Sequence, residues 1–443
     1  MFNNKKIFIL GMARSGYEVA KFLSKYNCEI LITDMKNQDE EKLKELESLG
    51  IKCIITNNQE DLLDSSYDYL IKNPGVPIDA PVIKKANNLK IPVTNEVEVA
   101  FHYLPKNVQI IGITGSNGKT TTTTLLYEIF KEAGFPVHLG GNIGIPASKL
   151  INDIKEGDYL IIEISSHQLH DFQKFKTNVS VLTNVVETHL EHFYTFEAYK
   201  NSKSKIFNFH TNQDIAIVNA SDQESLDLTK NIKSKKITFS SKMHADIYIK
   251  DNSLYYQREK IINLDSIKIK GNHNYENVMS AIGVCKYYKI PIEAIIKTLQ
   301  SFPGVEHRIE FVKELKNRKF YNDSKSTNIL ATKTALSSFS EPTILLLGGM
   351  NRNQNFNELL PHMKKIKKII CYGEVKDEVD KFAKINNISS EVVNNLEEAT
   401  IKAYETSNEH DVILLSPAAA SWDQFKDYEE RGNLFKKVVQ TVK

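Results

Sequence analysis

The most specific chemical signal in the 443-residue sequence is the glycine-containing turn Thr114-Gly-Ser-Asn-Gly-Lys-Thr-Thr-Thr122. An apolar run over 108–113 predicts a buried strand before this turn, and a helical pattern follows it. A strand, a glycine turn and a helix N-terminus together place backbone N–H groups around phosphate oxygens. Lys119 would then neutralise the β- and γ-phosphates, and Thr120 would offer its hydroxyl to Mg²⁺. A strict Walker A loop has glycine where this chain has Ile113, so a glycine turn without a ligand is the alternative.

Two other side chains follow predicted strands of the same segment. Glu163 lies near the end of the strand predicted over 159–164. Ligands of open α/β sheets bind at this edge, where a carboxylate is a suitable ligand for Mg²⁺. His189 follows another apolar run, which favours contact with a ligand or substrate over a purely structural role. For Glu163 the alternative is a solvent-exposed acid at a strand end.

A second nucleotide-binding pattern opens the chain. The apolar run Ile7–Leu10 leads into the turn Gly11-Met-Ala-Arg-Ser-Gly16 and a helical pattern, and a second run over 29–33 ends in Asp34. This order predicts a βαβ unit. The dinucleotide fingerprint G-x-G-x-x-G needs glycine in place of Ala13, which weakens the hypothesis of an NAD site.

The rest of the chain alternates between strand and helix patterns. A run over 67–72 ends in the loop Asn73-Pro-Gly-Val-Pro77, and the alternation continues to about Gln300. After the linker signal Phe302-Pro-Gly-Val, strands are predicted over 343–347, 369–373 and 412–415. We therefore predict an α/β protein of three domains: a Rossmann-like domain over 1–96, a P-loop-type ATPase with a parallel sheet over 97–303, and a second Rossmann-like domain over 304–443.

Composition narrows the class of protein further. The chain is 41% hydrophobic and 25% charged, and its formal net charge of +2 gives no electrostatic case for nucleic-acid binding. Its four cysteines have no paired spacing, which fits a reducing compartment and suggests neither disulfides nor a zinc site. No stretch approaches twenty apolar residues, and the short apolar run at the N-terminus lacks a cleavage signal. We expect a soluble, cytoplasmic monomer without nucleic-acid or membrane partners.

Several short motifs occur in the order found in Mur ligases, and together they cover essentially the whole chain. They are Thr114-Gly-Ser-Asn-Gly-Lys-Thr120, Gly141-Asn-Ile-Gly144, Glu163-Ile-Ser-Ser166, His273-Asn-Tyr-Glu-Asn277, His307-Arg308 and Asn322-Asp-Ser-Lys-Ser-Thr-Asn328. The last of these, with Leu415-Ser-Pro-Ala-Ala-Ala-Ser-Trp-Asp-Gln-Phe425 and Arg431-Gly-Asn433, resembles the members that add D-glutamate to UDP-N-acetylmuramoyl-L-alanine. The resemblance implies three domains that bind the UDP-linked substrate, ATP and the amino acid, in this order.

The resemblance also implies roles for individual residues. It assigns the UDP-linked substrate to Arg14, Ser15, Asp34, Lys36, Asn73, Gly75, Asn142, Ser165 and His189. It assigns ATP to Gly115, Ser116, Asn117, Gly118, Lys119, Thr120, Thr121, Thr122, Asn277, Arg308 and Asp323. The implied D-glutamate residues are Lys325, Thr327, Arg352, Ser421 and Tyr428. Catalysis is implied for Lys119, Glu163, His189 and Lys203, and the binding of two Mg²⁺ ions for Thr120, Glu163, His189 and Lys203.

Lys203 matches a lysine that the family carbamylates. An ammonium group cannot ligate Mg²⁺, whereas a carbamate supplies anionic oxygens. Without the resemblance, Lys203 would be one surface lysine among many. The chain also departs from some relatives, since Arg352 stands where they carry lysine and Tyr428 where they carry phenylalanine. The segment around His189 lacks the acids and arginine often seen there, so these differences bear on substrate geometry rather than on the reaction class.

The implied reaction is ATP-dependent amide formation in peptidoglycan synthesis. The alanine carboxylate would attack the γ-phosphate of ATP, and the amine of D-glutamate would then displace phosphate from the acyl phosphate. The alternatives are a sister ligase for another amino acid, a folate polyglutamate ligase, an NAD-dependent oxidoreductase, and a nucleotide-sensing regulatory protein. Asp323-Ser-Lys-Ser-Thr327 sets a cation among hydroxyls, which suits a dicarboxylic amino acid. The sequence has no Asp-Asn-Pro-Arg motif, which argues against a diaminopimelate-adding enzyme.

Overall fold

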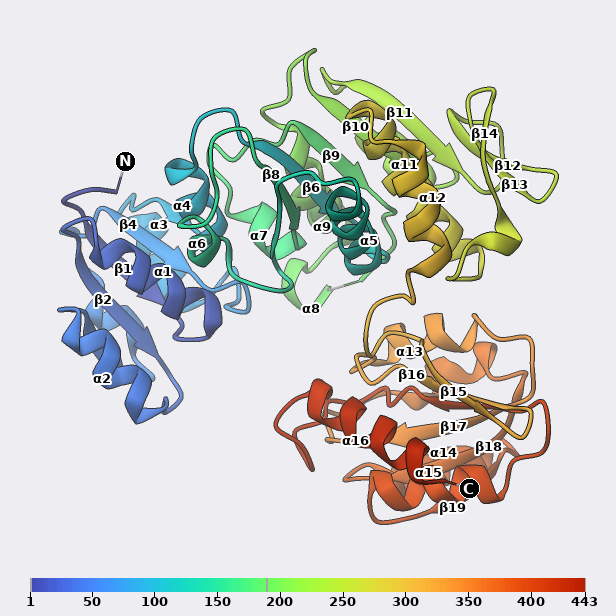
Figure 1. The fold of residues 1–443 in the computed structure, drawn as a ribbon. Helices are drawn as coiled ribbons and strands as arrows, with labels where there is room; N and C mark the ends of the chain where they lie inside the picture. The colour runs from blue at the N-terminus through green and yellow to red at the C-terminus, as the bar shows by residue number, and fades with distance from the viewer. Residues whose placement is uncertain (1, 189, 443) are drawn as a thin grey trace. The chain divides into compact units, whose positions relative to one another are not determined.

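The computed structural model describes residues 2–188 and 190–442. The chain forms two compact units, Met1–Phe302 and Pro303–Lys443 (Figure 1). The first unit contains two sheets and the second unit contains one, and helices pack on all three. The predicted α/β class with three sheet-based parts is therefore confirmed.

The first sheet consists of five parallel strands in the order β3-β2-β1-β4-β5. They are β1 (Lys6–Leu10), β2 (Glu29–Asp34), β3 (Lys52–Ile55), β4 (Tyr69–Lys72) and β5 (Val93–Thr94), with helices α1 (Arg14–Ser24), α2 (Glu40–Ser48) and α3 (Pro81–Asn88). The apolar residues of β1 are buried because helices cover both faces of a parallel sheet. The strand order reverses between β1 and β4, and ligands bind outside the carboxyl ends of strands at such a reversal.

The central sheet has nine strands in the order β14-β13-β12-β11-β10-β9-β6-β8-β7. They are β6 (Gln109–Thr114), β7 (Val137–Gly141), β8 (Tyr159–Glu163), β9 (Val179–Leu182), β10 (Ile215–Asn219), β11 (Lys235–Ser240), β12 (Ile247–Lys250), β13 (Ser253–Tyr256) and β14 (Glu259–Asn263). Strands β6 to β12 pair in parallel, whereas β12, β13 and β14 form an antiparallel meander. This meander departs from the predicted alternation of strands and helices.

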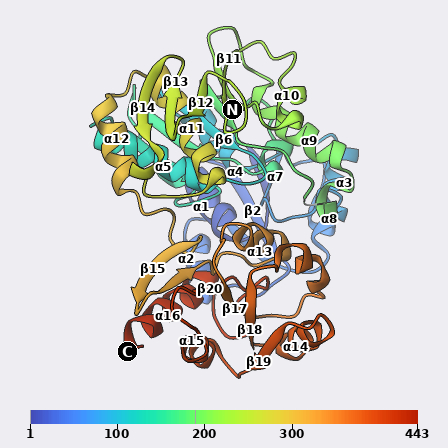
Figure 2. The same ribbon diagram turned by 90° about the vertical axis from the view of Figure 1, so that its right-hand side faces the viewer.

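Three helices of the central domain pack together, and both views show them side by side (Figures 1 and 2). They are α5 (Lys119–Glu132), α11 (Asn272–Tyr287) and α12 (Ile292–Ser301). The remaining helices of this domain are α6 (Ala147–Leu150), α7 (Ser166–His170), α8 (Leu190–Phe193), α9 (Phe196–Ser204) and α10 (Gln223–Leu228).

Helix α4 (Glu96–Tyr103) joins the first sheet to the central domain through buried polar contacts. Its N-cap Asn95 donates a 2.7 Å hydrogen bond from Nδ2 to the carbonyl oxygen of Gln168. The Glu98 carboxylate accepts the backbone N–H groups of residues 173–175 at 2.9–3.2 Å. Glu96 accepts the backbone N–H of Ser148, and burial raises the pKa of Glu96 to about 7. Buried hydrogen bonds around α4 therefore connect the two domains of this unit.

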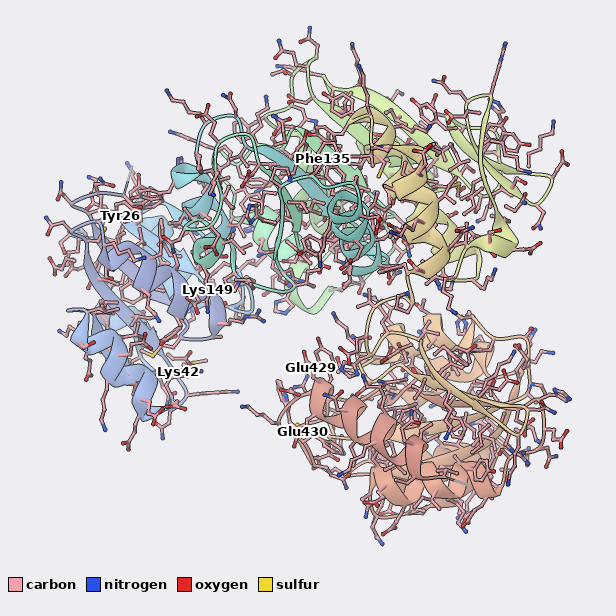
Figure 3. All side chains as sticks on the ribbon, viewed as in Figure 1. Tyr26, Lys42, Phe135, Lys149, Glu429 and Glu430 are labelled. Carbon is pink, nitrogen blue, oxygen red and sulfur yellow. The ribbon has the colours of Figure 1, made fainter. Side chains whose placement is uncertain are left out.

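Contacts at the edge of this joint involve side chains labelled in Figure 3. Tyr26 packs against Tyr103 of α4 with 4.3 Å between the ring centroids. Lys149 of α6 forms a 3.4 Å ion pair with Glu18 of α1. Such an exposed pair contributes little to stability, so the buried contacts of α4 dominate the joint.

The second unit contains a six-stranded sheet in the order β15-β16-β20-β17-β18-β19. Its strands are β15 (Glu310–Leu315), β16 (Arg318–Asn322), β17 (Thr343–Gly348), β18 (Ile366–Tyr372), β19 (Ser389–Val392) and β20 (Val412–Leu415). Only β15 is antiparallel to its neighbour. The helices are α13 (Ile329–Leu336), α14 (Lys376–Ile385), α15 (Leu396–Glu405) and α16 (Tyr428–Thr441). Glu429 and Glu430, labelled in Figure 3, lie in the first turn of α16, where acidic side chains complement the helix dipole.

Candidate active site

The phosphate loop connects β6 to α5, as its sequence predicts. Gly118 precedes α5 with φ of 82°, and a Cβ atom there would lie 2.1 Å from Oδ1 of Asn277. Gly115 has φ of 149°, and its Cβ would lie 1.9 Å from Oγ1 of Thr183. Both positions therefore require glycine. Lys119 folds back over the loop, since its Nζ donates to the carbonyl oxygens of Gly115 at 2.8 Å and Ser116 at 3.0 Å.

The segment that follows β9 forms hydrogen bonds with the phosphate loop. The backbone N–H of Asn117 donates to Oδ1 of Asn184 at 3.0 Å. The Ser116 hydroxyl accepts the backbone N–H of Val186 at 2.9 Å and lies 2.8 Å from the hydroxyl of Tyr199. The Asn117 amide and the Ser116 hydroxyl thus both attach the phosphate loop to neighbouring segments, which restricts its shape.

Glu163 ends β8 beside this loop, and its side chain is 2% exposed. Its Oε1 accepts a 2.8 Å hydrogen bond from Nδ2 of Asn142. Among the described residues nothing hydrogen-bonds to Oε2. Gly141 lets β7 pass close to the backbone of Glu163, because a Cβ atom at this position would lie 2.3 Å from the carbonyl oxygen of Glu163. A buried carboxylate oxygen without a partner costs free energy unless a ligand satisfies it.

Lys203 lies on α9 and is 1% exposed, so it is not a surface lysine. Its Nζ lies 4.6 Å from the ring centroid of Tyr199. Burial and the positive charge of Lys119 lower the pKa of Lys203 far below the ordinary lysine value, while Glu163 acts in the opposite direction. The charges of Lys119 and Glu163 therefore both act on Lys203 at the carboxyl edge of the central sheet.

The predicted uridine-nucleotide residues gather at the carboxyl ends of β1, β2 and β4. The Ser15 hydroxyl donates to Oδ1 of Asn73 at 3.0 Å. Gly11 makes this approach possible, because a Cβ there would lie 2.8 Å from Cβ of Asn73. Asp34 accepts the backbone N–H groups of Met12 at 2.8 Å and Lys36 at 3.0 Å, so it connects the loops after β1 and β2. Three of the predicted residues are exposed at this edge: Arg14, Lys36 and Gly75.

In the second unit, Asp323 follows β16 and is 2% exposed. Its oxygens accept hydrogen bonds from the hydroxyls of Ser326 at 2.5 Å and Ser416 at 2.8 Å and from the backbone N–H of Ile309 at 3.1 Å. Burial raises the pKa of Asp323 to about 6, against the lowering effect of these donors and of Arg308. Asp323 therefore ties the loops after β16 and β20 together.

The predicted D-glutamate residues lie at the same edge of the second unit's sheet. Nζ of Lys325 lies 5.6 Å from the ring centroid of Tyr428, the first residue of α16. The Arg352 guanidinium lies 4.5 Å from the ring centroid of Trp422. Ser421, which directly precedes Trp422 in the sequence, is buried, and Thr327 is partly buried.

The structure brings the predicted residues together in three groups, two in the first unit and one in the second. The first group is the uridine-nucleotide edge, and the second comprises residues 115–122 with Asn142, Glu163, Ser165, Lys203 and Asn277. In the second group, Ser165 caps α7 and belongs to a capping box with Gln168. Arg308 and Asp323, predicted to bind ATP, lie in the second unit with the D-glutamate residues. His189 lies outside the described residues.

Sequence reasoning missed Tyr199 and Trp422. Tyr199 contacts both Ser116 and Lys203, but nothing in its sequence context marks it. Trp422 carried a signal, because it is the chain's single tryptophan and stands beside the predicted residue Ser421.

Comparisons with known proteins agree with this arrangement. Residues 5–95 match the Mur ligase MurD-like N-terminal domain, residues 113–285 the Mur ligase middle domain, and residues 307–419 the Mur ligase glutamate ligase domain. A UDP-N-acetylmuramoylalanine–D-glutamate ligase of Geobacillus kaustophilus is 40% identical over 100% of this chain and 99% of its own. A ligase of the same name from Bacillus thuringiensis is 40% identical over 100% of this chain and 98% of its own.

Solved structures share the fold at low sequence identity. UDP-N-acetylmuramate-alanine ligase MurC from Thermotoga maritima has a TM-score of 0.64 and 18% identity, covering 99% of both chains. MurF from Acinetobacter baumannii has a TM-score of 0.60 and 14% identity, covering 94% of this chain and 92% of its own. With the full-length relatives, these comparisons establish that the chain belongs to the Mur ligase family. Among the described residues, no helix is long and apolar enough to cross a membrane.

Proposed function

We propose that the chain catalyses the ATP-dependent ligation of D-glutamate to UDP-N-acetylmuramoyl-L-alanine in peptidoglycan synthesis. The observation that carries this proposal is the convergence of Lys119, Glu163 and Lys203 beside a phosphate loop, where one buried oxygen of Glu163 has no hydrogen-bond partner among the described residues. The full-length similarity to ligases of this name supports the choice of substrates. We further propose a cytoplasmic monomer, with residues 1–96 binding the UDP-linked substrate, 97–303 binding ATP and 304–443 binding the amino acid.

The residues at the central edge fit a divalent cation. Oε2 of Glu163 is a hard oxygen to which no group in the described part of the chain donates, and Thr120 supplies a hydroxyl at the start of α5. We propose that Thr120, Glu163 and a carbamylated Lys203 hold two Mg²⁺ ions, with His189 as a further ligand. Bound Mg²⁺ would neutralise charge on the transferred phosphoryl group.

Carbamylation would replace an unfavourable positive charge at Lys203 with a negative one. The buried amine of Lys203 is disfavoured in its charged form by burial and by the cation Lys119, and Glu163 opposes this effect. A carbamate would replace this amine with anionic oxygens, which attract both Lys119 and a metal ion. Tyr199 would pack against the modified side chain, since its ring already lies beside Nζ.

The chain's own groups have defined tasks in this reaction. Lys119 would stabilise the γ-phosphoryl group while a carboxylate oxygen of the alanine attacks it, which yields an acyl phosphate and ADP. The amine of D-glutamate would then attack the acyl carbon, the C–O bond to phosphate would break, and the amine would lose a proton. Lys325 and Arg352 would hold the carboxylates of D-glutamate.

An isotope experiment tests the acyl-phosphate route. With the heavy oxygen isotope in the alanine carboxylate, one labelled oxygen should leave in the released phosphate. Amide product formed together with unlabelled phosphate would contradict this route while leaving the ligase activity intact.

A further inference from the structure

Trp422 is the chain's only tryptophan, and 60% of it is exposed. It follows Ser421 in the loop after β20, and its indole ring lies 4.5 Å from the Arg352 guanidinium. A guanidinium over an aromatic face is attracted by the ring quadrupole. The exposed ring therefore has a defined contact, which restricts where the flexible Arg352 side chain points.

The guanidinium N–H groups of Arg352 remain available to a ligand, whereas its backbone N–H donates to Oε1 of Gln354 at 2.7 Å. Its side chain is exposed, and it forms no ion pair within residues 2–188 and 190–442. A stacked guanidinium keeps its N–H donors in the plane of the group, where they can bind a carboxylate through two parallel hydrogen bonds.

A second cation at the same edge has the same arrangement. Lys325 lies over the ring of Tyr428, and both aromatic residues come from the segment 422–428. Lys325 follows β16, Arg352 follows β17 and Trp422 follows β20, and these three parallel strands are neighbours in the order β16-β20-β17. The loops after β17 and β20 are also joined by a 2.8 Å hydrogen bond from Met350 N–H to the carbonyl oxygen of Ala420. Two cations over two rings at one edge match a ligand with two carboxylates.

We propose that Trp422 is a positioning residue that holds the Arg352 guanidinium as the receptor for one carboxylate of the acceptor amino acid. With Lys325 as the second cation, this arrangement selects a dicarboxylic amino acid. The inference rests on the proposed ligase function. It gives a role to Trp422, which is not among the residues predicted to contact substrate.

Steady-state kinetics of the full-length enzyme tests the proposal. Trp422→Ala should raise KM for D-glutamate about two- to fivefold, the range expected for losing an exposed cation–π contact. The value of kcat and the KM values for ATP and the UDP-linked substrate should stay unchanged. Trp422→Phe keeps an aromatic face and should restore most of the loss. Phe311→Ala, which removes another exposed ring of this domain from β15, is the matched control and should match wild type.

Fluorescence provides a readout that a purely structural role would not change. Because Trp422 is the only tryptophan, D-glutamate added to wild type with a non-transferable ATP analogue and the UDP-linked substrate should change its emission saturably. L-Glutamate should not, and Arg352→Ala should lose the response. Two results obtained with an active wild-type enzyme would overturn the role of Trp422. One is an unchanged KM for D-glutamate in Trp422→Ala, and the other is a wild-type emission that does not respond to D-glutamate. A wild-type enzyme that forms no amide with D-glutamate would instead overturn the proposed function.

Discussion

Lys72, the last residue of β4, forms a 3.0 Å ion pair with Asp171, which follows α7 of the central domain, and both side chains are at most 4% exposed. Nζ of Lys72 also donates to the carbonyl oxygen of Val76 at 3.2 Å, and His170 lies 2.9 Å from the other oxygen of Asp171. The pair therefore connects the loop proposed to bind the uridine nucleotide with the helix that follows the Glu163 strand. This contact fixes the carboxyl end of β4 against α7.

Removing Lys72 should destabilise the first unit strongly. In Lys72→Ala the Asp171 carboxylate stays buried without its cation, a change that costs about 3–5 kcal/mol in comparable buried pairs. Denaturant unfolding should show this loss, and KM for the UDP-linked substrate should rise because the Val76 contact is lost. The control is Lys44→Ala, which breaks an exposed pair with Glu40 and should cost less than about 0.5 kcal/mol. Equal stabilities of the two variants would contradict the role assigned to the buried pair.

Lys119→Ala should abolish phosphate release while the fold survives. Nζ of Lys119 donates to two carbonyl groups of the loop, and in the proposed reaction it stabilises the charge of the transferred phosphoryl group. We expect kcat to fall about a hundredfold or more, the scale seen when a transition-state donor is removed. Circular dichroism should match wild type. The control is Lys131→Ala, on the exposed last turn of the same helix, which should remain active. A near-normal rate of phosphate release in Lys119→Ala would contradict the catalytic role proposed for Lys119.

Lys203→Ala should be inactive and partly rescued by acetate or formate. Truncation opens a cavity next to Glu163, and a small carboxylic acid can supply the oxygens that the carbamate would provide. Lys203→Arg should resist rescue, since it leaves a permanent cation in this space. Lys200→Ala, on the same helix but paired with Glu197 and Glu224, is the matched control and should stay active. Full unaided activity of Lys203→Ala would exclude Lys203 as a metal ligand.

Asp323 should make the stability of the second unit depend on pH. Burial raises its pKa from 3.8 to about 6, so between these values the folded state binds a proton that the unfolded chain releases. Its contribution to stability is therefore fully present below about pH 4 and declines as pH rises through 6, by about 2–3 kcal/mol in total. Asp323→Asn removes this titration. The melting temperature of the variant relative to wild type should rise between pH 4 and pH 7.5, and a difference independent of pH would contradict the raised pKa.

The elements that could be predicted from the sequence are those marked by a pattern of neighbouring residues. The apolar run over 412–415 coincides with β20, and the predicted strand, turn and helix around Lys119 are present as β6, the phosphate loop and α5. The sequence did not predict the meander β12–β14, although a signal was present. The pair Asp251-Asn252 forms the two-residue turn of the first hairpin with positive φ at both residues, a conformation that Asp and Asn tolerate better than most residues.

Long-range contacts could not be predicted in the same way. The residue types of the site followed from spacing and resemblance, but the burial of Lys203 depends on α9 packing beside the phosphate loop. The pairing of Lys72 with Asp171 joins residues 99 positions apart (171 minus 72), and the contact between Arg352 and Trp422 depends on the strand order of the third sheet. Such contacts depend on tertiary structure, which local periodicity does not encode.

The most direct test of the account is phosphate release by the purified full-length chain with ATP, Mg²⁺ and UDP-N-acetylmuramoyl-L-alanine, with the amino acid varied. We predict release stoichiometric with amide product for D-glutamate, and little or none for L-glutamate, L-lysine or diaminopimelate. A different preferred amino acid, or phosphate release that is equal in the absence of any amino acid, would contradict the proposed function.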